Sequence, residues 1–214
     1  MTPLALLRAV VPLLRRSGCQ YAVAGGLAAA LYRREPRLTQ DVDVLLLASS
    51  IRGTQNEAEK ILGKLKFSVG LARASDLNRA PGFHKRQDPV VMLVGRKEGK
   101  EKEGGLDVLL PTMPWVVRAI ERAQCNLIDF GFGRLPTITP EDLIVAKALA
   151  LTDNPSRYKD LDDLQSIFEA NLQLDFPYLV SLFELHRLWL PRALEKVAPK
   201  PVQRASRSQS PKHR

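Results

Sequence analysis

The sequence has little that would support thiol or imidazole chemistry. It contains two cysteines, Cys19 and Cys125, and three histidines among 214 residues. Neither cysteine has a second cysteine or a histidine at the spacing of a zinc site, so zinc is not indicated. Two isolated cysteines favour free thiols over a disulfide, and we expect a cytoplasmic protein.

Long apolar runs are also missing, because the longest fall far short of the roughly 20 residues that span a bilayer. Residues 1–14 begin apolar, but Arg8 interrupts them and no clean cleavage site follows, so we predict an amphipathic helix and not a signal peptide. A hydrophobic share of 45% with mixed charges is typical of a soluble globular chain. No membrane partner is expected.

Acidic residues are absent from the C-terminal end of the chain. Residues 196–214 carry six Lys and Arg residues and no Asp or Glu, against a net charge of +9 for the whole sequence. Their Pro and Ser content predicts a disordered basic tail. Such a tail either attracts RNA or DNA or only keeps the protein in solution, and the sequence leaves both open.

What the sequence does contain is a distinctive stretch over residues 21–47. An apolar run ends at Gly25-Gly26, a helix-prone segment follows, and Asp41-Val42-Asp43-Val44 opens a second apolar run. On a strand, both carboxylates project from one face and repel each other unless a cation lies between them. Carboxylate oxygens of this kind suit Mg²⁺. Gly25-Gly26 reads as a strand-to-helix turn, which is a favourable place for a phosphate.

This combination resembles the signature of the DNA polymerase β-like nucleotidyltransferase superfamily. It is most similar to the branch of abortive-infection E toxins, whose Arg-x-Ser/Thr-x-Asp-x-Asp run is matched by Arg37, Thr39, Asp41 and Asp43. The resemblance covers about residues 20–170. It implies an α/β (α+β) fold, a mixed β-sheet flanked by helices, with a helical C-terminal extension. It also implies that Thr39 lies at the nucleotide.

Asp107 is the candidate for a third carboxylate, which the superfamily places on a later strand beside the Asp-x-Asp strand. It lies in an apolar segment, residues 106–110, which we expect to form a hairpin with residues 90–94. A carboxylate in such a strand needs a partner, unless it faces water on an edge strand. Asp41, Asp43 and Asp107 would then hold a two-metal Mg²⁺ site.

A second block of family motif lies further along the chain. In the similar branch, a helix with a lysine is followed by a turn and an Arg/Lys-Asp pair, matched here by Lys147, Lys159 and Asp160. Lys147 would supply positive charge to a triphosphate, and Asp160 would orient it. The alternative is a surface lysine and helix-capping acids in the first turn of a helix.

We predict three segments: a nucleotidyltransferase core over residues 1–138, a helical extension over 139–195, and the tail over 196–214. Within the core, residues 53–66 have helical spacing with Thr54 as N-cap. The basic loop over residues 72–89 either reaches a phosphate or is simply solvated.

The expected activity is Mg²⁺-dependent transfer of NMP from an NTP, such as ATP, to an acceptor hydroxyl, with release of pyrophosphate. The resemblance suggests RNA, such as the 3′ end of tRNA, or a protein as acceptor, and a cognate toxin or antitoxin as partner. Transfer to a small antibiotic, or a non-catalytic nucleotide- or RNA-binding module with the same fold, are the alternatives.

Overall fold

The computed structural model describes residues 1–76, 88–99, 104–170 and 172–209. The chain divides into two compact units. Among the described residues, the first unit consists of Met1–Ala28, Arg37–Asp76 and the residues from 88 to Thr139. The second unit consists of Ala29–Pro36 and the residues from Pro140 onward. The C-terminal part of the second unit begins at Pro140, and residues 29–36 also belong to that unit.

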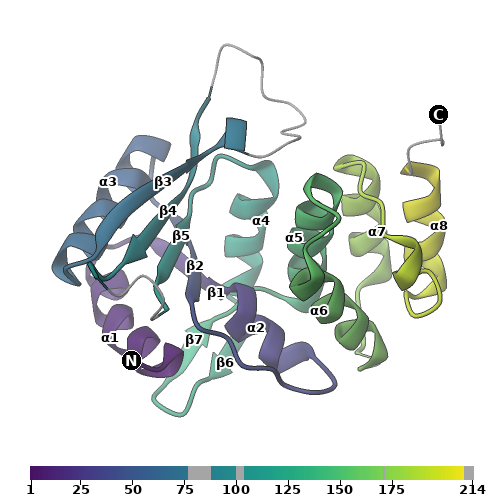
Figure 1. Ribbon diagram of the computed structural model, residues 1–214, viewed down its shortest axis with the longest axis horizontal. Coiled ribbons are helices and arrows are strands. Elements are labelled where there is room, and N and C mark those ends of the chain that lie inside the picture. Colours follow the sequence, from purple (N-terminus) through teal and green to yellow (C-terminus); the bar gives the residue numbers. More distant parts are fainter. Residues whose placement is uncertain (77–87, 100–103, 171, 210–214) are drawn as a thin grey trace. The chain divides into compact units, whose positions relative to one another are not determined.

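A five-stranded sheet forms the centre of the first unit (Figure 1). Its strands are β1 (Gln20–Ala24), β2 (Val42–Leu47), β3 (Ser68–Arg73), β4 (Val90–Arg96) and β5 (Leu106–Leu109). In the order β1-β2-β5-β4-β3, the β2/β5 pair is parallel and the other pairs are antiparallel. The mixed sheet and the pairing of β4 with β5 are as predicted.

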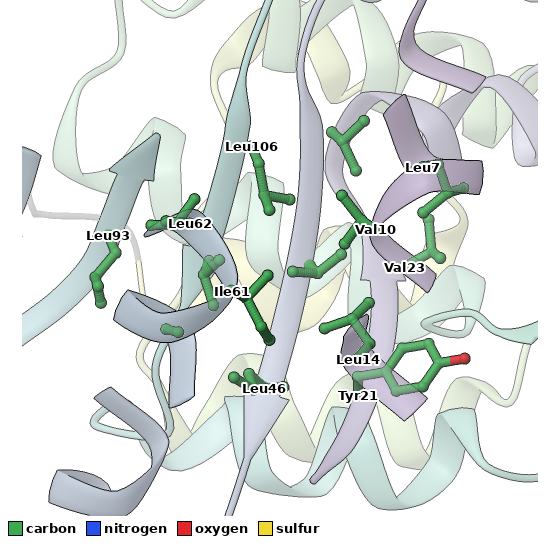
Figure 2. Close-up of a cluster of buried hydrophobic side chains, with 14 of the residues drawn as sticks. Leu7, Val10, Leu14, Tyr21, Val23, Leu46, Ile61, Leu62, Leu93 and Leu106 are labelled. Carbon is green, nitrogen blue, oxygen red and sulfur yellow. The ribbon is translucent and has the colours of Figure 1, made fainter. Parts of the chain in front are cut away.

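Helices cover both faces of this sheet (Figure 1). They are α1 (Pro3–Arg16) and α3 (Ile51–Lys64) on one face and α4 (Pro114–Ala123) on the other. Side chains of α1 and α3 meet those of the strands in a buried cluster that includes Leu14, Leu46 and Leu106 (Figure 2). Because Val42, Val44 and Leu46 belong to this cluster, strand alternation turns Asp43 to the opposite face.

The start of α3 corrects the predicted N-cap. The capping residue is Ser50, whose Oγ accepts from the N–H of Gly53 at 3.0 Å. Thr54 is buried within the first turns, where its Oγ1 donates to the carbonyl of Ser50 and accepts from the N–H of Ala48, both at 2.9 Å. Serine and threonine are both residue types that cap helices well. Ser50 is the cap because its backbone is extended and the helix begins at the next residue.

A small hairpin and two short helical segments complete the first unit and lead into the second. They are β6 (Leu127–Asp129), β7 (Arg134–Pro136), the 3₁₀ turn η1 (Ala74–Asp76) and helix α2 (Gly25–Tyr32), which starts in the first unit and ends in the second. The hairpin turns at residues 131–133, as predicted. The predicted basic loop lies mostly outside the described residues.

The second unit is helical. Its elements are α5 (Pro140–Asp153), α6 (Tyr158–Glu169), α7 (Phe176–Leu185), the 3₁₀ turn η2 (Arg192–Leu194) and α8 (Lys200–Gln209). Within the described residues, no helix of either unit is long and apolar enough to cross a bilayer.

Helix α8 corrects the predicted disordered tail. Val202 and Ala205 are buried, and the Oγ of Ser206 accepts from the N–H of Leu190 at 2.7 Å. The segment as a whole is poor in apolar residues, but those it has recur on one side of a helix, which is enough to bury that side. Residues 210–214 lie outside the described residues.

Candidate active site

The strand pair β2/β5 places two of the three predicted metal ligands side by side. Asp43 is the direct register partner of Asp107, and Asp41 comes just before β2. The side chain of Asp41 is 39% exposed and that of Asp107 is 13% exposed. Asp107 therefore does not lie on an edge strand facing water, because β5 is paired on both sides.

Gly25 and Gly26 bring the first turn of α2 directly against Asp43. The N–H of Gly26 donates to Oδ2 of Asp43 at 3.3 Å. A Cβ on Gly25, whose φ is +56°, would lie 1.9 Å from Oδ2 of Asp43. A Cβ on Gly26 would lie 2.4 Å from Oγ1 of Thr39. Both positions therefore require glycine because the side chains of Asp43 and Thr39 approach the backbone so closely. This requirement is independent of phosphate binding.

Thr39 closes this corner of the site. Its Oγ1 donates to the backbone carbonyl of Asp41, the first residue of the Asp-x-Asp pair, at 3.4 Å. The structure therefore brings together five predicted residues: Gly25, Gly26, Thr39, Asp41 and Asp43. Their proximity follows from the β1-α2-β2 path of the chain.

Arg96, at the end of β4, is the residue that sequence reasoning missed. Its Nη1 and Nη2 reach the two carboxylate oxygens of Asp107 at 2.6 and 3.3 Å, a bidentate contact. Nη2 also lies 3.5 Å from Oδ1 of Asp41. We call Asp41, Asp43, Asp107 and Arg96 the carboxylate site. Only the register of β4 against β5 could have indicated this contact from the sequence. Val94 is the register partner of Asp107, and Arg96 lies two residues further along β4 on the same face.

The loop before β5 is shaped around this arginine. The N–H of Gly105 donates to Oδ1 of Asp41 at 2.9 Å. A Cβ on Gly105 would lie 2.3 Å from Nη1 of Arg96 and 2.1 Å from the carbonyl oxygen of Gly95. Sequence reasoning treated residues 95–105 only as a polar linker, and did not identify Gly105 as part of the site.

Burial and neighbouring charges shift two pKa values in the carboxylate site. Burial raises the pKa of Asp107 above its usual value, and the repulsion from Asp41 adds to this, although Arg96 opposes it. The hydrogen bond to Asp107 and the fields of Asp41 and Asp43 raise the pKa of Arg96. Arg96 therefore lies in the combined field of all three carboxylates and stays charged.

The second motif block falls in the second unit, where it forms an ion-pair network. Nζ of Lys147 contacts Oδ1 of Asp160 at 2.9 Å and Oδ2 of Asp163 at 2.5 Å. Lys147 is only 6% exposed, so it is not a surface lysine. Asp163 is completely buried. The structure thus brings Lys147 and Asp160 together, and Lys147 pairs with Asp163 as well as with Asp160.

Arginines extend this network on both sides. Nη1 of Arg33, which directly follows α2, contacts Asp163 at 2.6 Å and Asp162 at 2.8 Å. Arg157 pairs with Asp160. Burial raises the pKa of Asp160, but the attraction of Lys147 and Arg157 outweighs it, so the net pKa is lowered. We call Arg33, Lys147, Arg157, Asp160, Asp162 and Asp163 the ion-pair network.

Arg33 and Asp163 were missed from the sequence, although Asp160 and Asp163 share a helix face at i, i+3 spacing. Lys159, the remaining predicted nucleotide-binding residue, is exposed on α6. The predicted nucleotide-binding set is therefore divided between the units: Gly25, Gly26 and Thr39 lie in the first, and Lys147, Lys159 and Asp160 in the second.

The carboxylate site has the chemistry that Mg²⁺ requires, because hard oxygen donors lie on two adjacent strands and face the same side. Backbone N–H groups of Gly26 and Gly105 fix one oxygen each of Asp43 and Asp41. Among the residues that the structure describes, no three acidic, histidine or cysteine side chains converge on one point. Asp107 is turned to Arg96 instead. The donors thus fit the metal in kind, while Arg96 engages Asp107 and also pairs with Asp41.

Comparison with known proteins concerns the chain as a whole. A family model described as "Nucleotidyl transferase AbiEii toxin, Type IV TA system" matches residues 13–213. No curated protein matches the sequence significantly.

Three solved structures share the fold. The antibiotic-resistance factor ANT(2″)-Ia in solution superposes with a TM-score of 0.51 at 13% identity, covering 86% of this chain and 90% of that one. The same protein in complex with adenylyl-2″-tobramycin gives 0.50 at 13% identity, covering 86% and 96%. An antigenic nucleotidyltransferase-like protein from Paracoccidioides brasiliensis gives 0.50 at 17% identity, covering 92% and 93%. These likenesses confirm the expected fold class.

Proposed function

Because the chain belongs to the AbiEii nucleotidyl transferase toxin family of type IV toxin–antitoxin systems, we propose that it moves NMP from an NTP to a hydroxyl group of RNA. The family makes it a nucleotidyltransferase and implies an antitoxin as its cognate partner. Our proposal adds the acceptor, the dependence on Mg²⁺, the residues that act and a cytoplasmic location.

The observation that carries the proposal is the register of Asp43 with Asp107, with the Gly25-Gly26 turn against Asp43. Asp41, Asp43 and Asp107 would hold Mg²⁺. When bound, the metal would neutralise the triphosphate and stabilise the charge that develops on the attacking and leaving oxygens. The turn at the start of α2 would receive the phosphates through its backbone N–H groups.

The chain's own residues then account for the rest of the reaction. A bond forms between the acceptor oxygen and the α-phosphorus, the bond from the α-phosphorus to the bridging oxygen breaks, and pyrophosphate leaves. Asp107 would accept the hydroxyl proton at its carboxylate, for which a raised pKa is favourable. In the second unit, Lys147 with its partner Asp160, and Lys159, remain the proposed nucleotide-binding residues.

RNA is favoured as acceptor by the distribution of charge on the C-terminal helix. Lys200, Arg204 and Arg207 are exposed on α8, which contains no acidic residue, and Lys196 is exposed just before it. Arg207 lies 3.4 Å from Glu195. A helix fixed by its apolar side and basic on the other side matches the phosphate backbone of a nucleic acid.

The test is incubation of the protein with Mg²⁺, each labelled NTP in turn, and either total tRNA, the antitoxin or tobramycin. We expect label on tRNA, and none with the Asp43→Asn variant. Label on the antitoxin or on tobramycin alone would replace RNA with a protein or a small molecule as acceptor. Absence of label on all three would contradict the proposed transfer to RNA.

Helix α8 is tested separately through salt dependence. Lys200→Gln with Arg204→Gln should weaken RNA binding and reduce the slope of log K against log[salt] by about 1.4 to 1.8, because each lost phosphate contact removes about 0.7 to 0.9. Arg8→Gln with Arg15→Gln removes two exposed charges from α1 and is the matched control. Equal slopes for both double variants would exclude α8 as the RNA-binding surface.

A further inference from the structure

We propose that Arg96 is a built-in competitor for the divalent metal, holding Asp107 and Asp41 in the metal-free enzyme and leaving them when metal and nucleotide bind. The inference rests on the proposed function, because it assumes that the three aspartates hold metal. It assigns to Arg96 a positioning role that neither the family motif nor the predicted site contains.

The contacts of Arg96 engage both oxygens of Asp107. Both oxygens of Asp107 face guanidinium nitrogens, at 2.6 and 3.3 Å, and the same guanidinium lies 3.5 Å from Asp41. A metal ligated by Asp107 would bring a second positive charge to the same carboxylate. The guanidinium and the metal would repel each other in this partly buried site, so we expect them to exchange at Asp107 and not to share it.

The position of Arg96 is built into the fold and is not a chance contact of a surface side chain. Nη1 also donates to the carbonyl of Gly95 at 2.9 Å, so the guanidinium is fixed by a backbone acceptor as well as by two carboxylates. Gly105 leaves room for it, since a Cβ there would lie 2.3 Å from Nη1. The loop that positions Asp41 through the N–H of Gly105 is therefore the loop that accommodates Arg96.

Arg96 can nevertheless leave. Its side chain is 23% exposed, whereas that of Asp107 is 13% exposed, so the guanidinium has access to solvent that the carboxylate lacks. A planar guanidinium also binds phosphate oxygens in the same bidentate way as a carboxylate. Once displaced, Arg96 is available to the triphosphate, and metal and nucleotide binding reinforce each other.

The experiment titrates Mn²⁺, as a probe for Mg²⁺, into nucleotide-free wild-type protein and three variants. Arg96→Gln removes the competitor, and Arg96→Lys keeps the charge but loses the bidentate fork. Lys97→Gln removes the same charge from the next residue and is the matched control. Calorimetry gives the affinity, and thermal unfolding with and without Mn²⁺ gives a readout that does not depend on activity.

We expect Arg96→Gln to bind Mn²⁺ about tenfold tighter or more, since it need not break a charge-assisted contact first. Its metal-free form should melt lower than wild type, because Asp107 loses its partner, and Mn²⁺ should raise its melting temperature more than that of wild type. Arg96→Lys should fall between, and Lys97→Gln should match wild type.

A non-hydrolysable NTP analogue supplies the second half of the test. It should tighten Mn²⁺ binding more in wild type than in Arg96→Gln, because only wild type has a guanidinium to transfer to the phosphates. Equal Mn²⁺ affinities for wild type and Arg96→Gln would overturn the exchange while leaving the metal site intact. Wild-type protein and variants that all fail to bind Mn²⁺ would overturn the metal site and the exchange together.

Discussion

Two clusters of three aspartates, one in each unit, differ in how their charges are balanced. In the carboxylate site, Asp41, Asp43 and Asp107 share the field of Arg96. In the ion-pair network, Asp160, Asp162 and Asp163 meet Arg33, Lys147 and Arg157. The second cluster contains as many bases as acids, and the first contains three acids and one base.

The difference appears in the pKa values of the two clusters. Burial and repulsion from Asp41 together raise the pKa of Asp107 more than Arg96 lowers it, whereas two bases lower the pKa of Asp160 more than burial raises it. A carboxylate whose charge is only partly compensated favours an additional cation, and a fully paired one holds helices together. The comparison suggests that the first cluster is arranged for ligands and the second mainly for structure.

The same substitution in each cluster should separate these roles. Asp43→Asn should lower transfer at least about a hundredfold, since even groups outside the ligand shell cost 10- to 100-fold. Its thermal stability should be equal to or above that of wild type, because one source of repulsion is removed and the amide oxygen still accepts from Gly26. Asp163→Asn should instead destabilise the second unit. Transfer assays and thermal unfolding on both variants measure the two effects, and destabilisation by Asp43→Asn would contradict the comparison.

Lys147 tests whether the ion-pair network is structural, catalytic or both. Lys147→Met leaves two buried carboxylates without their shared partner and should cost about 3–5 kcal/mol of unfolding free energy. The matched control is Lys159→Met on α6, an exposed lysine, which should stay within about 0.5 kcal/mol of wild type. Denaturant titration gives both values.

Nucleotide binding by Lys147 is then measured below the melting temperature of the variant. If Lys147 also contacts the triphosphate, folded Lys147→Met binds NTP more weakly than wild type and transfers more slowly, and Lys147→Arg rescues incompletely because its planar fork presents the charge differently. Wild-type affinity and turnover in the folded variant would restrict Lys147 to the structural role and withdraw the second motif block from the nucleotide site.

Gly25 tests how closely the turn must approach the carboxylate site. Gly25→Ala adds a Cβ that would lie 1.9 Å from Asp43 and also strains a φ of +56°. Gly18→Ala is the matched control, because its φ is +71° and an added Cβ meets nothing within 4 Å. Each should lose about 1–2 kcal/mol from the positive φ. Only Gly25→Ala should also slow transfer, by about a hundredfold for a displacement near 1 Å. Equal activities would show that Asp43 tolerates the displacement.

The sequence predicted much of the first unit, because its signals are local. Strand alternation placed Asp41 and Asp43 outside the core, and the β1-α2-β2 path brought Gly25 and Gly26 to them. Arg96 could not be found in this way, since its contact with Asp107 depends on the register of a hairpin whose linker gives no register signal. Arg33 pairs with residues about 130 positions away, and no local pattern specifies such a contact.

The tail was mispredicted for a related reason. Composition averaged over residues 196–214 indicated disorder, but folding depends on whether a few apolar side chains share one helix face. Val202 and Ala205 do, and both are buried. Average composition is therefore a poorer guide here than periodicity.

The smallest expected effect is the opposite response of the two clusters to pH. The folded-state pKa of Asp160 lies below its ordinary value of 3.8, so its contribution to stability is complete above pH 3.8 and is lost as the pH falls through the lowered pKa. The folded-state pKa of Asp107 lies above 3.8, so its contribution is complete below pH 3.8 and is lost as the pH rises through the raised pKa. Denaturant unfolding of metal-free protein at a series of pH values measures both.

Asp160→Asn should reduce the loss of stability in acid, below pH 3.8, and Asp107→Asn should reduce the loss of stability that occurs as the pH rises above 3.8. The same pH response from both variants would mean that the two clusters are balanced alike, and the distinction between a ligand site and a structural network would then have to rest on the transfer assays alone.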